Sequence, residues 1–450
     1  MKAIKLLLSA VLTVASIPAI AGGFLTNTNQ SVSFLRMPAQ EAVISVDGAY
    51  FNPAGVAFLD EGFHIGGNWQ AAFQTRQTTT EFAPLAYGEA NNLKSTKKYT
   101  GKTTAPFIPS LDLAYVKGKF AVSAHFGIIG GGGSAVYNDG IGTFETAIAA
   151  YAAAINQATA PQQVLYGADI YVNGTSFFIG SQINAAYRIT DWLSASLGIR
   201  GTYALANYDA YIHDITLNGQ PAGPTLTNMG MAQYAALVAD RDLKCDQNGF
   251  ALAPILGVDV KAGKWNIAAR YEFREKLVLK NSTEKNTTGI NSYDDGVKAR
   301  QDIPSLLAIG IGYSVLPELR LFGAFHSYGD KAAHFEGDRE DLLGRGCLEG
   351  LFGVEYDLGE KLTLSTGVQY CSFDFGKDNQ YLTDMSFNTN STSVGIGGKY
   401  KLTDKIDLEC GYFHSFYQKA EQKSSLNNLP LNTRFFRTSD VLGLGLKARF

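Results

Sequence analysis

The chain has few cysteines, and their spacing gives them no shared role. Four cysteines occur among 450 residues, and no two of them form a C-x-x-C pair. That pattern argues against a zinc site or a thioredoxin-type centre, and four cysteines cannot build a disulfide framework for a chain of this size. Cys347 and Cys371 fall on one face of two neighbouring predicted strands. A bond between them and two free thiols both remain open.

Long apolar runs are missing beyond the N-terminus. A membrane helix needs roughly 18 consecutive apolar residues, and no later run reaches that length, which excludes a helical membrane protein. The near-neutral mean hydropathy is what barrel strands produce, because each of them carries only a weak hydropathy signal. The net charge of −3 is too balanced to attract nucleic acid, so we expect no nucleic-acid partner.

Enzyme motifs are also lacking. The six histidines include His125, His326 and His414, and none of them accompanies a G-x-S-x-G or a comparable nucleophile motif. We therefore expect no enzyme activity, no catalytic residue, no metal and no cofactor.

The first residues have the pattern of an export signal. Lys2 and Lys5 form a basic start, Leu6 to Ile20 an apolar core, and Ala19-Ile20-Ala21 a small-x-small cleavage site. A membrane anchor is the alternative, but the core is short and polar residues follow it. The sequence predicts a signal peptide at 1–21 and a mature chain that begins near Gly22.

The stretch 440–450 alternates strictly between two faces. One face carries an apolar row, made of Leu442, Leu444, Leu446, Ala448 and Phe450. Period-two alternation is typical of a strand with one apolar and one polar or small face. A soluble sheet gives this pattern, and so does a lipid-facing barrel strand that closes on the first strand.

From Glu61 onward, strand-like runs are separated in turn by very short turns and by long polar loops. The short turns fall at 117–119, 190–192, 262–264, 316–318, 359–361 and 403–405. The long loops fall near 83–108, 131–175, 210–249, 281–303, 329–345, 375–388 and 420–435. This rhythm predicts about fourteen strands with all short turns at one end, as in bacterial outer-membrane barrels.

The faces of the strands agree with a barrel. The runs 177–189, 265–273 and 406–416 carry charges on one face only and aromatic residues near the strand ends on the other. Lipid outside and a polar lumen inside would select this arrangement. The predicted fold class is therefore all-β, with a transmembrane antiparallel barrel of about fourteen strands over residues 61–450.

Residues 22–60 do not alternate and precede the first strand. The run Asn52-Pro53-Ala54-Gly55 has turn chemistry, because Asn bonds its own backbone, Pro fixes φ and Gly allows a positive φ. A loop leading into the barrel is one interpretation. However, Phe24, Phe34 and Phe51 make the segment too apolar for a free linker, so we expect it to fill a cavity.

Two loops contain runs with helical periodicity. Residues 143–158 place Ile148, Tyr151 and Ile155 on one stripe, and residues 228–240 do the same with Met231 and Tyr234. The helices either pack on their own loops or form an apolar ledge at the outer mouth, where a hydrophobic ligand first settles.

Four stretches together resemble a known family. They are AGGF at 21–24, FNPAG at 51–55, DIPSLLAIGIGYSVLPELRLFGAF at 302–325, and RTSDVLGLGLKARF at 437–450. In this order, around a predicted barrel, they resemble the FadL/TodX family of outer-membrane transporters for hydrophobic compounds. The likeness spans nearly the whole mature chain.

The resemblance implies a fourteen-stranded barrel whose lumen is plugged by an N-terminal hatch. Extracellular loops would capture a hydrophobic ligand, a fatty acid or an aromatic hydrocarbon, and pass it to an apolar pocket. The ligand would then leave sideways into outer-membrane lipid, without a coupled energy source, through a monomer in the bacterial outer membrane. Asn52, Pro53, Ala54 and Gly55 would be hatch residues, and Phe24 would touch the pocket. The run RMPAQEAVISVDGAY before FNPAG departs from the Gly-, Ala- and Asp-rich run expected there.

The glycines after Lys119 suggest where the side exit lies. The run Phe126 to Gly133 reads FGIIGGGG, and glycine weakens ladder pairing and tolerates sharp bends. An unpaired edge in lipid must be covered by protein, so a kink here should fold inward over the hatch. Gly127 is the candidate residue for a lateral gap. The alternative is that 130–133 only begin a flexible loop.

Other classes of protein compete with this interpretation. A diffusion porin for small polar solutes is the main alternative, but it needs an open lumen, which an apolar segment at 24–58 argues against. A structural or adhesive barrel would leave that segment without a role.

Overall fold

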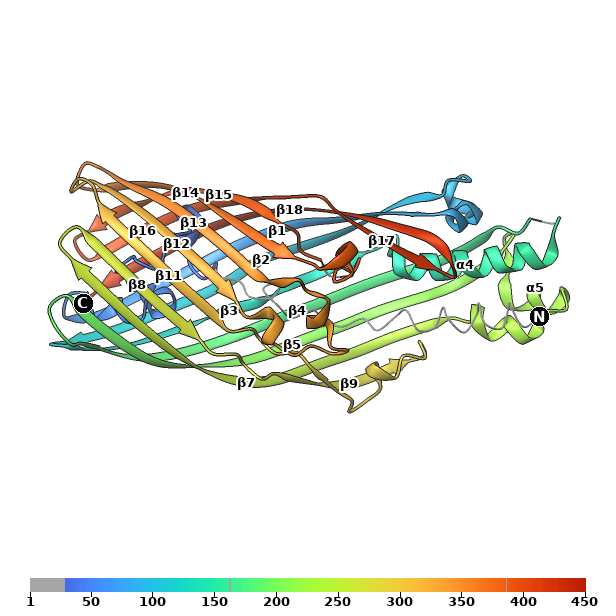
Figure 1. Cartoon of the computed structure of the whole chain (residues 1–450), viewed down its shortest axis with the longest axis horizontal. Helices are drawn as coiled ribbons and strands as arrows, with labels where there is room; N and C mark the ends of the chain where they lie inside the picture. The colour runs from blue at the N-terminus through green and yellow to red at the C-terminus, as the bar shows by residue number, and fades with distance from the viewer. Residues whose placement is uncertain (1–28, 162, 386) are drawn as a thin grey trace.

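The structure is a computed structural model that describes residues 29–161, 163–385 and 387–450. Within these ranges the chain forms one closed antiparallel barrel of fourteen wall strands, which confirms the predicted fold class. Figure 1 shows the barrel from the side, with the strands tilted against its long axis. The predicted signal peptide at 1–21 and the pocket candidate Phe24 lie outside the described residues.

Three wall strands are each interrupted once. Strands β8 and β9 both pair with β7 and together form one wall strand. Strands β10 and β11 form the next one, with β10 opposite β9 and β11 opposite β8. Strands β16 and β17 both pair with β18. The two-residue β6 (Gln220–Pro221) pairs only with the outer end of β5. The wall consists of β1 (Gly62–Phe82), β2 (Thr96–Lys117), β3 (Phe120–Tyr137), β4 (Tyr166–Arg188), β5 (Leu193–Leu217), β7 (Arg241–Ala262), β8 (Trp265–Glu272) with β9 (Val278–Asn286), β10 (Lys298–Arg300) with β11 (Leu306–Ser314), β12 (Leu319–Tyr328), β13 (Arg345–Leu358), β14 (Leu362–Asp374), β15 (Ser391–Thr403), β16 (Ile406–Tyr417) with β17 (Ala420–Leu426), and β18 (Leu429–Arg449).

Short helices lie inside the barrel and around its outer mouth. Those inside are α2 (Val32–Arg36), α3 (Gly48–Phe51) and the 3-10 helix η1 (Gly55–Phe58). Those in the outer loops are η2 (Ala83–Tyr87), η3 (Glu89–Asn91), α4 (Gly142–Thr159), α5 (Ala222–Asn228), η4 (Ala232–Val238), η5 (Asn291–Tyr293), η6 (Asp330–Ala332), η7 (Arg339–Leu342) and η8 (Lys377–Asn379). Among the described residues, no helix is both long and apolar enough to cross a membrane.

The six predicted short turns are confirmed, and they all lie at one end of the barrel. The outer ends of several strands were predicted too short. Residues 131–137 belong to β3 and residues 166–175 to β4, although both ranges were expected in a loop. The single helix expected over 228–240 is also wrong, because α5 ends at Asn228 and η4 is a separate 3-10 helix.

The apolar rows of the strands face outward. On β18, Leu444 is 57% exposed and the neighbouring Gly443 lies against the inner segment, so the two predicted faces are assigned correctly. β18 pairs with β1 along nearly its whole length, from Arg449 opposite His64 to Leu431 opposite Phe82. This pairing joins the last strand to the first and so closes the sheet. Cys347 and Cys371 are free thiols.

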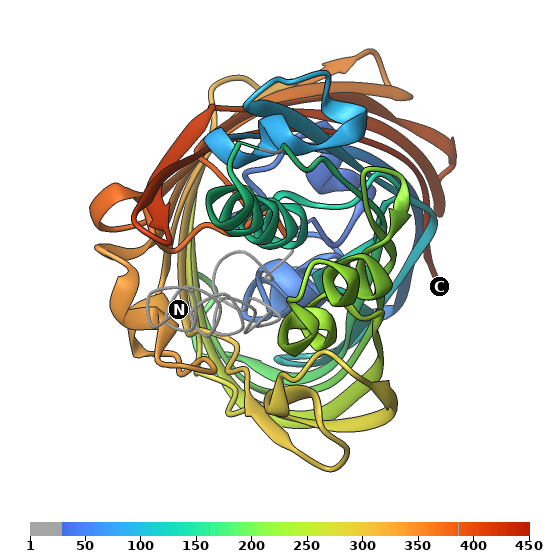
Figure 2. The ribbon, with the colours of Figure 1, turned by 90° about the vertical axis from the view of Figure 1, so that its right-hand side faces the viewer.

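Residues 29–60, called the inner segment below, lie inside the wall. Figure 2 looks along the barrel from its outer mouth and shows this segment, in blue, enclosed by the strands. Nearly all of its side chains from Gln30 to Ala57 are buried. The core of the molecule is therefore the contact between this segment and the lumen face of the wall.

Candidate functional site in the lumen

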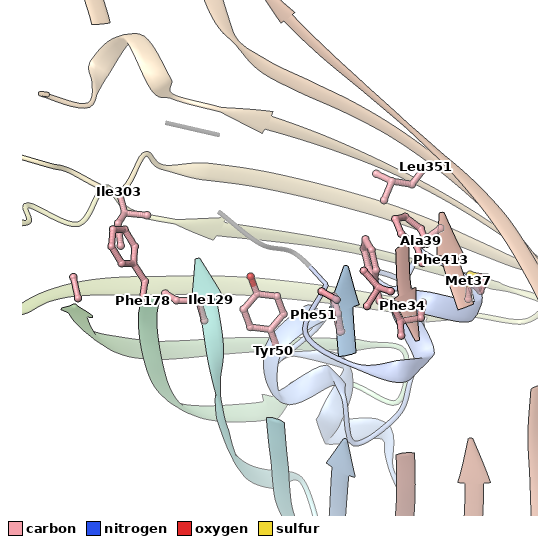
Figure 3. Close-up of a cluster of buried hydrophobic side chains, with 14 of the residues drawn as sticks. Phe34, Met37, Ala39, Tyr50, Phe51, Ile129, Phe178, Ile303, Leu351 and Phe413 are labelled. Carbon is pink, nitrogen blue, oxygen red and sulfur yellow. The ribbon is translucent and has the colours of Figure 1, made fainter. Parts of the chain in front are cut away.

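An apolar cluster joins the inner segment to the wall. The rings of Phe34 and Phe51 stack with centroids 6.0 Å apart, and Phe413 of β16 lies 5.6 Å from Phe34. Figure 3 shows these rings together with Tyr50, while Ile129 and Phe178 extend the cluster toward β3 and β4. Two of the three predicted pocket residues, Phe34 and Phe51, thus lie side by side in the lumen.

The predicted hatch residues form a hydrogen-bonded turn against the wall. Asn52 Nδ2 donates to Asp259 Oδ2 at 2.5 Å, and Gly55 N donates to Asn52 Oδ1 at 3.0 Å. Ser194 Oγ donates to the carbonyl of Ala54 at 2.7 Å. A Cβ at Gly55 would lie 2.4 Å from Asn52 Nδ2, so any other residue there would displace the Asn52 side chain. Pro53 lies in the same turn, between Asn52 and Ala54.

A buried ion network fixes the first helix of the inner segment. Arg36 Nη1 lies 2.5 Å from Glu355 Oε1, and its Nη2 lies 3.3 Å from Glu409 Oε1. Burial lowers the pKa of Arg36, but the two glutamates outweigh burial and raise it above its usual value. Lys447 of β18 adds a bridge to Asp47 and a contact of 3.2 Å to Glu409. Buried ion pairs between the inner segment and the wall therefore hold the segment in place.

A second charged contact joins Glu41 of the inner segment to the wall. His326 Nε2 is 2.7 Å from Glu41 Oε1, and His326 Nδ1 is 2.7 Å from Glu349 Oε2. Two carboxylates on the two ring nitrogens suit an imidazolium, because only that form has two N–H groups to donate. The positive ring therefore joins the inner segment to β12 and β13.

The wall ladder is broken between β2 and β3. Register runs without a gap from Lys117 opposite Phe120 to Leu111 opposite Phe126, and it resumes only at Thr103 opposite Ala135. Pro106 and Pro109 lie within the unpaired part of β2, and proline has no N–H to donate to a ladder. β3 also loses regular register with β4 around Ile128 to Gly133.

Glycine allows the bend of β3 at this break. Gly131 has φ 93° and Gly133 has φ 69°, a backbone region that other residues rarely adopt. A Cβ at Gly131 would lie 2.3 Å from the carbonyl oxygen of Ser176. Gly130 to Gly133 are part of strand β3, so the alternative that they only begin a loop is wrong. Gly127 is the first β3 residue beyond the regular ladder.

Gln30 of the inner segment and Trp69 of β1 contact the two sides of the break. Gln30 Nε2 donates to the carbonyl of Ile128 at 2.9 Å, and Ser110 Oγ donates to the carbonyl of Gln30 at 2.6 Å. Trp69 Nε1, from the neighbouring β1, donates to the carbonyl of Pro106 at 3.0 Å. Backbone groups at membrane depth need such partners because lipid offers none. Gln30 therefore bridges the two sides of the break.

A cavity of about 190 Å³ connects the apolar cluster to the break. Phe34 and Phe413 line it from one side, and Ile108, Ile128 and Gly131 line it from the edges of β2 and β3. Polar residues line its remaining wall, among them Gln74, Thr103, Asn388, Ser391, Ser415, Tyr417 and Arg437. The cavity is thus apolar toward the break and polar toward β1 and β18.

The outer mouth holds two smaller apolar pockets. Ile148 and Tyr151 of α4 line a pocket of about 110 Å³ against β5 and β7. Tyr151 and Ile155 also line a second pocket, of about 20 Å³, together with Met231 and Tyr234. All five residues of the predicted ledge therefore belong to one apolar cluster or pack against it. Figure 2 shows the helices that carry them at the mouth of the barrel.

The start of α4 is held by another loop. Asp384 accepts from Thr143 N and from Thr143 Oγ1, both at 2.6 Å. The carboxylate satisfies backbone and side-chain donors in the first turn of α4, where negative charge is favourable. Burial raises the pKa of Asp384, and the bonds from Thr143 lower it less. The ledge is consequently tied to the loop between β14 and β15.

Sequence reasoning missed several residues of this site. No sequence pattern around Gln30, Ser110 or Trp69 indicates a site, because their hydrogen-bond partners lie on other elements. Pro106 and Pro109 did carry such a pattern, since two prolines within an alternating run indicate an unpaired edge. The loop expected near 83–108 contains Pro106 and ends just before Pro109.

Solved structures with the same fold complete this description. No family model matches the chain, and no curated protein matches it either. A Pseudomonas aeruginosa FadL homologue matches with TM-score 0.64 and 12% identity over 95% of this chain and 100% of that one. The Pseudomonas putida toluene transporter TodX matches with TM-score 0.55 and 12% identity over 97% and 100%. The Ralstonia pickettii toluene transporter TbuX matches with TM-score 0.53 and 13% identity over 92% and 98%. The chain therefore has the fold of an outer-membrane β-barrel of the FadL and TodX kind.

Proposed function

We propose that the protein carries hydrophobic compounds passively across the bacterial outer membrane. The observation that carries this proposal is the break between β2 and β3, which the apolar end of a lumen cavity reaches. A cavity that opens toward lipid through the wall suits a ligand that prefers lipid to water. The structural neighbours, a FadL homologue and two toluene transporters, agree with such a cargo.

The route begins at the ledge. A ligand first settles on the apolar surface of Ile148, Tyr151, Ile155, Met231 and Tyr234. It then passes into the lumen, where Phe34, Phe51 and Phe24 contact it. It leaves sideways beside Gly127 into the outer leaflet. No cofactor, metal or catalytic step is part of this route.

Residues 22–60 act as the hatch, with residues 61–450 as the barrel. Movement of the turn at Asn52, Pro53, Ala54 and Gly55 would widen the cavity toward the break. Because one chain carries every part of the route, a monomer suffices. The inner segment spans the lumen, and this position favours a hydrophobic cargo over the diffusion of small polar solutes expected of a porin.

Uptake by proteoliposomes tests the proposal. Vesicles that contain the folded protein should take up labelled oleate faster than protein-free vesicles, while labelled glucose should enter both at the same slow rate. An Ile148→Asp variant should lose oleate uptake, because a charge on the ledge repels an apolar ligand. The matched control is Leu342→Asp, at an exposed position in a different outer loop. Fast glucose entry with no oleate entry would contradict the proposal and favour the porin.

A further inference from the structure

An exposed group of basic side chains lies on the outward face of the ribbon formed by β9 and β10. Lys280 of β9 stands directly opposite Lys298 of β10, and both are exposed. Arg300 stands opposite Val278, two residues along on the same face, and it is exposed as well. Lys276 is exposed two residues before Val278, and the residue between them is buried. The basic cluster, as we call it below, consists of Lys276, Lys280, Lys298 and Arg300.

Little of the charge of the basic cluster is neutralised by the chain. Its three lysines make no ion pair with any described residue. Arg300 Nη2 lies 3.2 Å from Asp302 Oδ2, but Arg274 Nε lies 3.6 Å from the same oxygen and shares its charge. Two exposed carboxylates, Asp246 of β7 and Glu284 of β9, lie farther toward the outer end of the barrel. A surplus of positive charge therefore remains on this face.

The basic cluster lies just beyond the hydrocarbon core of the membrane. Below it, β8 has 8 residues and Phe273 follows, whereas a strand needs about 9–11 residues to cross the core. Tyr271 and Phe273 are exposed on the outward face and pack edge to face, with ring centroids 4.8 Å apart. Aromatic rings form girdles at the membrane–water interface. Figure 1 shows β9 beyond the end of β8, toward the outer loops, so Lys276 lies at the level of the lipid head groups.

Another part of the wall carries a different arrangement at the end of its apolar row. On β18 the outward row of leucines ends at Leu442, and Asp440 follows two residues farther out. Asp440 Oδ1 lies 2.7 Å from His414 Nδ1 and accepts from the hydroxyl of Tyr412 at 2.7 Å. The charge there has partners on the wall, whereas the lysines of the basic cluster do not.

We propose that the basic cluster binds the phosphate groups of a phosphorylated glycolipid in the outer leaflet, whose acyl chains lie against the apolar wall below. Phosphate oxygens accept charge-assisted hydrogen bonds from ammonium and guanidinium groups. A phosphate between Lys280 and Lys298 also relieves their repulsion, because directly opposed like charges destabilise a sheet. The aromatic pair at Tyr271 and Phe273 gives the upper part of the acyl chains an apolar surface. The site is on the outside of the barrel, so it does not depend on the cargo proposed above.

Binding by the folded, full-length protein in a non-ionic detergent tests this site. Diphosphoryl lipid A is compared with the same lipid without phosphates, and glucose 1-phosphate supplies a phosphate without acyl chains. EDTA is present, so that no divalent ion joins the lipid to a carboxylate. The variant combines Lys280→Gln with Lys298→Gln. The matched control combines Lys98→Gln with Lys102→Gln, which removes two exposed lysines from the outer half of β2.

We expect the variant to bind diphosphoryl lipid A about 10- to 30-fold more weakly than the unmodified protein, since each basic residue near a charged lipid surface contributes a factor of about five. Its affinity for the phosphate-free lipid should not change, and the control should bind both lipids as the unmodified protein does. Replacing Lys280 and Lys298 by arginine should preserve the preference for phosphate, because both charges remain. Titrations followed by native mass spectrometry measure these affinities.

Other outcomes would overturn the inference. Equal affinity of the unmodified protein for the two lipids would show that phosphate is not recognised. An equal loss in the variant and in the control would reduce the effect to net charge. Glucose 1-phosphate binding as tightly as diphosphoryl lipid A would indicate a small-anion site. A preference for phosphate that disappears in EDTA would assign the binding to a bridging metal ion. Each of these outcomes would leave oleate uptake, and with it the proposed function, untouched.

Discussion

Phe63 and Phe450 exchange two backbone hydrogen bonds. Phe63 N donates to the carbonyl of Phe450 at 3.1 Å, and Phe450 N donates to the carbonyl of Phe63 at 2.9 Å. The ring of Phe450 is 70% exposed on the lipid-facing side. These bonds form one end of the ladder between β1 and β18, which is the ladder that closes the barrel.

Phe450→Ala should therefore slow assembly. The backbone bonds can still form, but the aromatic ring no longer anchors the closing strand at the membrane surface. Folding into lipid vesicles, followed by the heat-dependent shift of gel migration, measures the folded fraction. Leu402→Ala is the control, because Leu402 is also an exposed apolar residue near a short turn. Equal folding of both variants would remove the special role of Phe450.

Leu444→Arg should destabilise the folded barrel by about 2–4 kcal/mol, the cost of a lipid-facing arginine near the middle of the membrane. Leu444 stands opposite Trp69 in the ladder, and both residues face outward. Urea titrations in lipid vesicles would measure the free energy of unfolding against Leu444→Ala. If arginine proved as stable as alanine, the assignment of this face to lipid would be wrong.

Gly127→Val should abolish uptake of a hydrophobic substrate while the barrel still folds. The added Cβ would lie 2.7 Å from Gln30 Oε1 and 2.9 Å from His125 Nε2, so it displaces the residue that bridges the break. Oleate uptake by proteoliposomes, with binding measured separately, tests the change. Gly350→Val is the control, since no atom lies within 4 Å of a Cβ there. Unchanged uptake by Gly127→Val would exclude this part of β3 from the exit.

Arg36→Met should loosen the inner segment. The change leaves buried Glu355 without its shorter ion pair and buried Glu409 without one of its two, at a cost of about 3 kcal/mol in the free energy of unfolding. Arg320 and Lys447 still face the two glutamates and limit the loss. Conductance through planar bilayers should show openings that the unmodified protein lacks. Arg449→Met is the control, because its pair with Asp60 is exposed and contributes about 1 kcal/mol or less. A closed channel in both variants would argue against this tether.

The sequence predicts the membrane-facing half of the barrel well. At Leu442, Leu444 and Leu446, lipid selects apolar residues on one face, so alternation reveals both strand and orientation. Turns such as Lys117-Gly118-Lys119 are equally clear, because glycine takes the positive φ, here 60°.

The outer halves and the lumen site are less predictable. Residues such as Lys97 and Lys98 of β2 lie on a strand that has left the lipid, so both faces become polar and the alternation disappears. The site depends on pairs such as Gln74 with Arg437, which only the closure of the barrel brings together. No local pattern encodes that register. The break itself does have a local pattern, because Pro106 and Pro109 indicate an unpaired edge.

Strands β4 and β5 have 23 and 25 residues, whereas crossing the hydrocarbon core takes about 9–11. More than half of each strand therefore rises above the hydrocarbon, and it carries the ledge on α4 with it. If the ledge is the entrance, as proposed, it would stand in the surrounding water, beyond the hydrated head groups that cover the outer leaflet. A solute captured at this height would descend past that polar layer within protein, and it would first meet lipid at a depth where acyl chains can dissolve it.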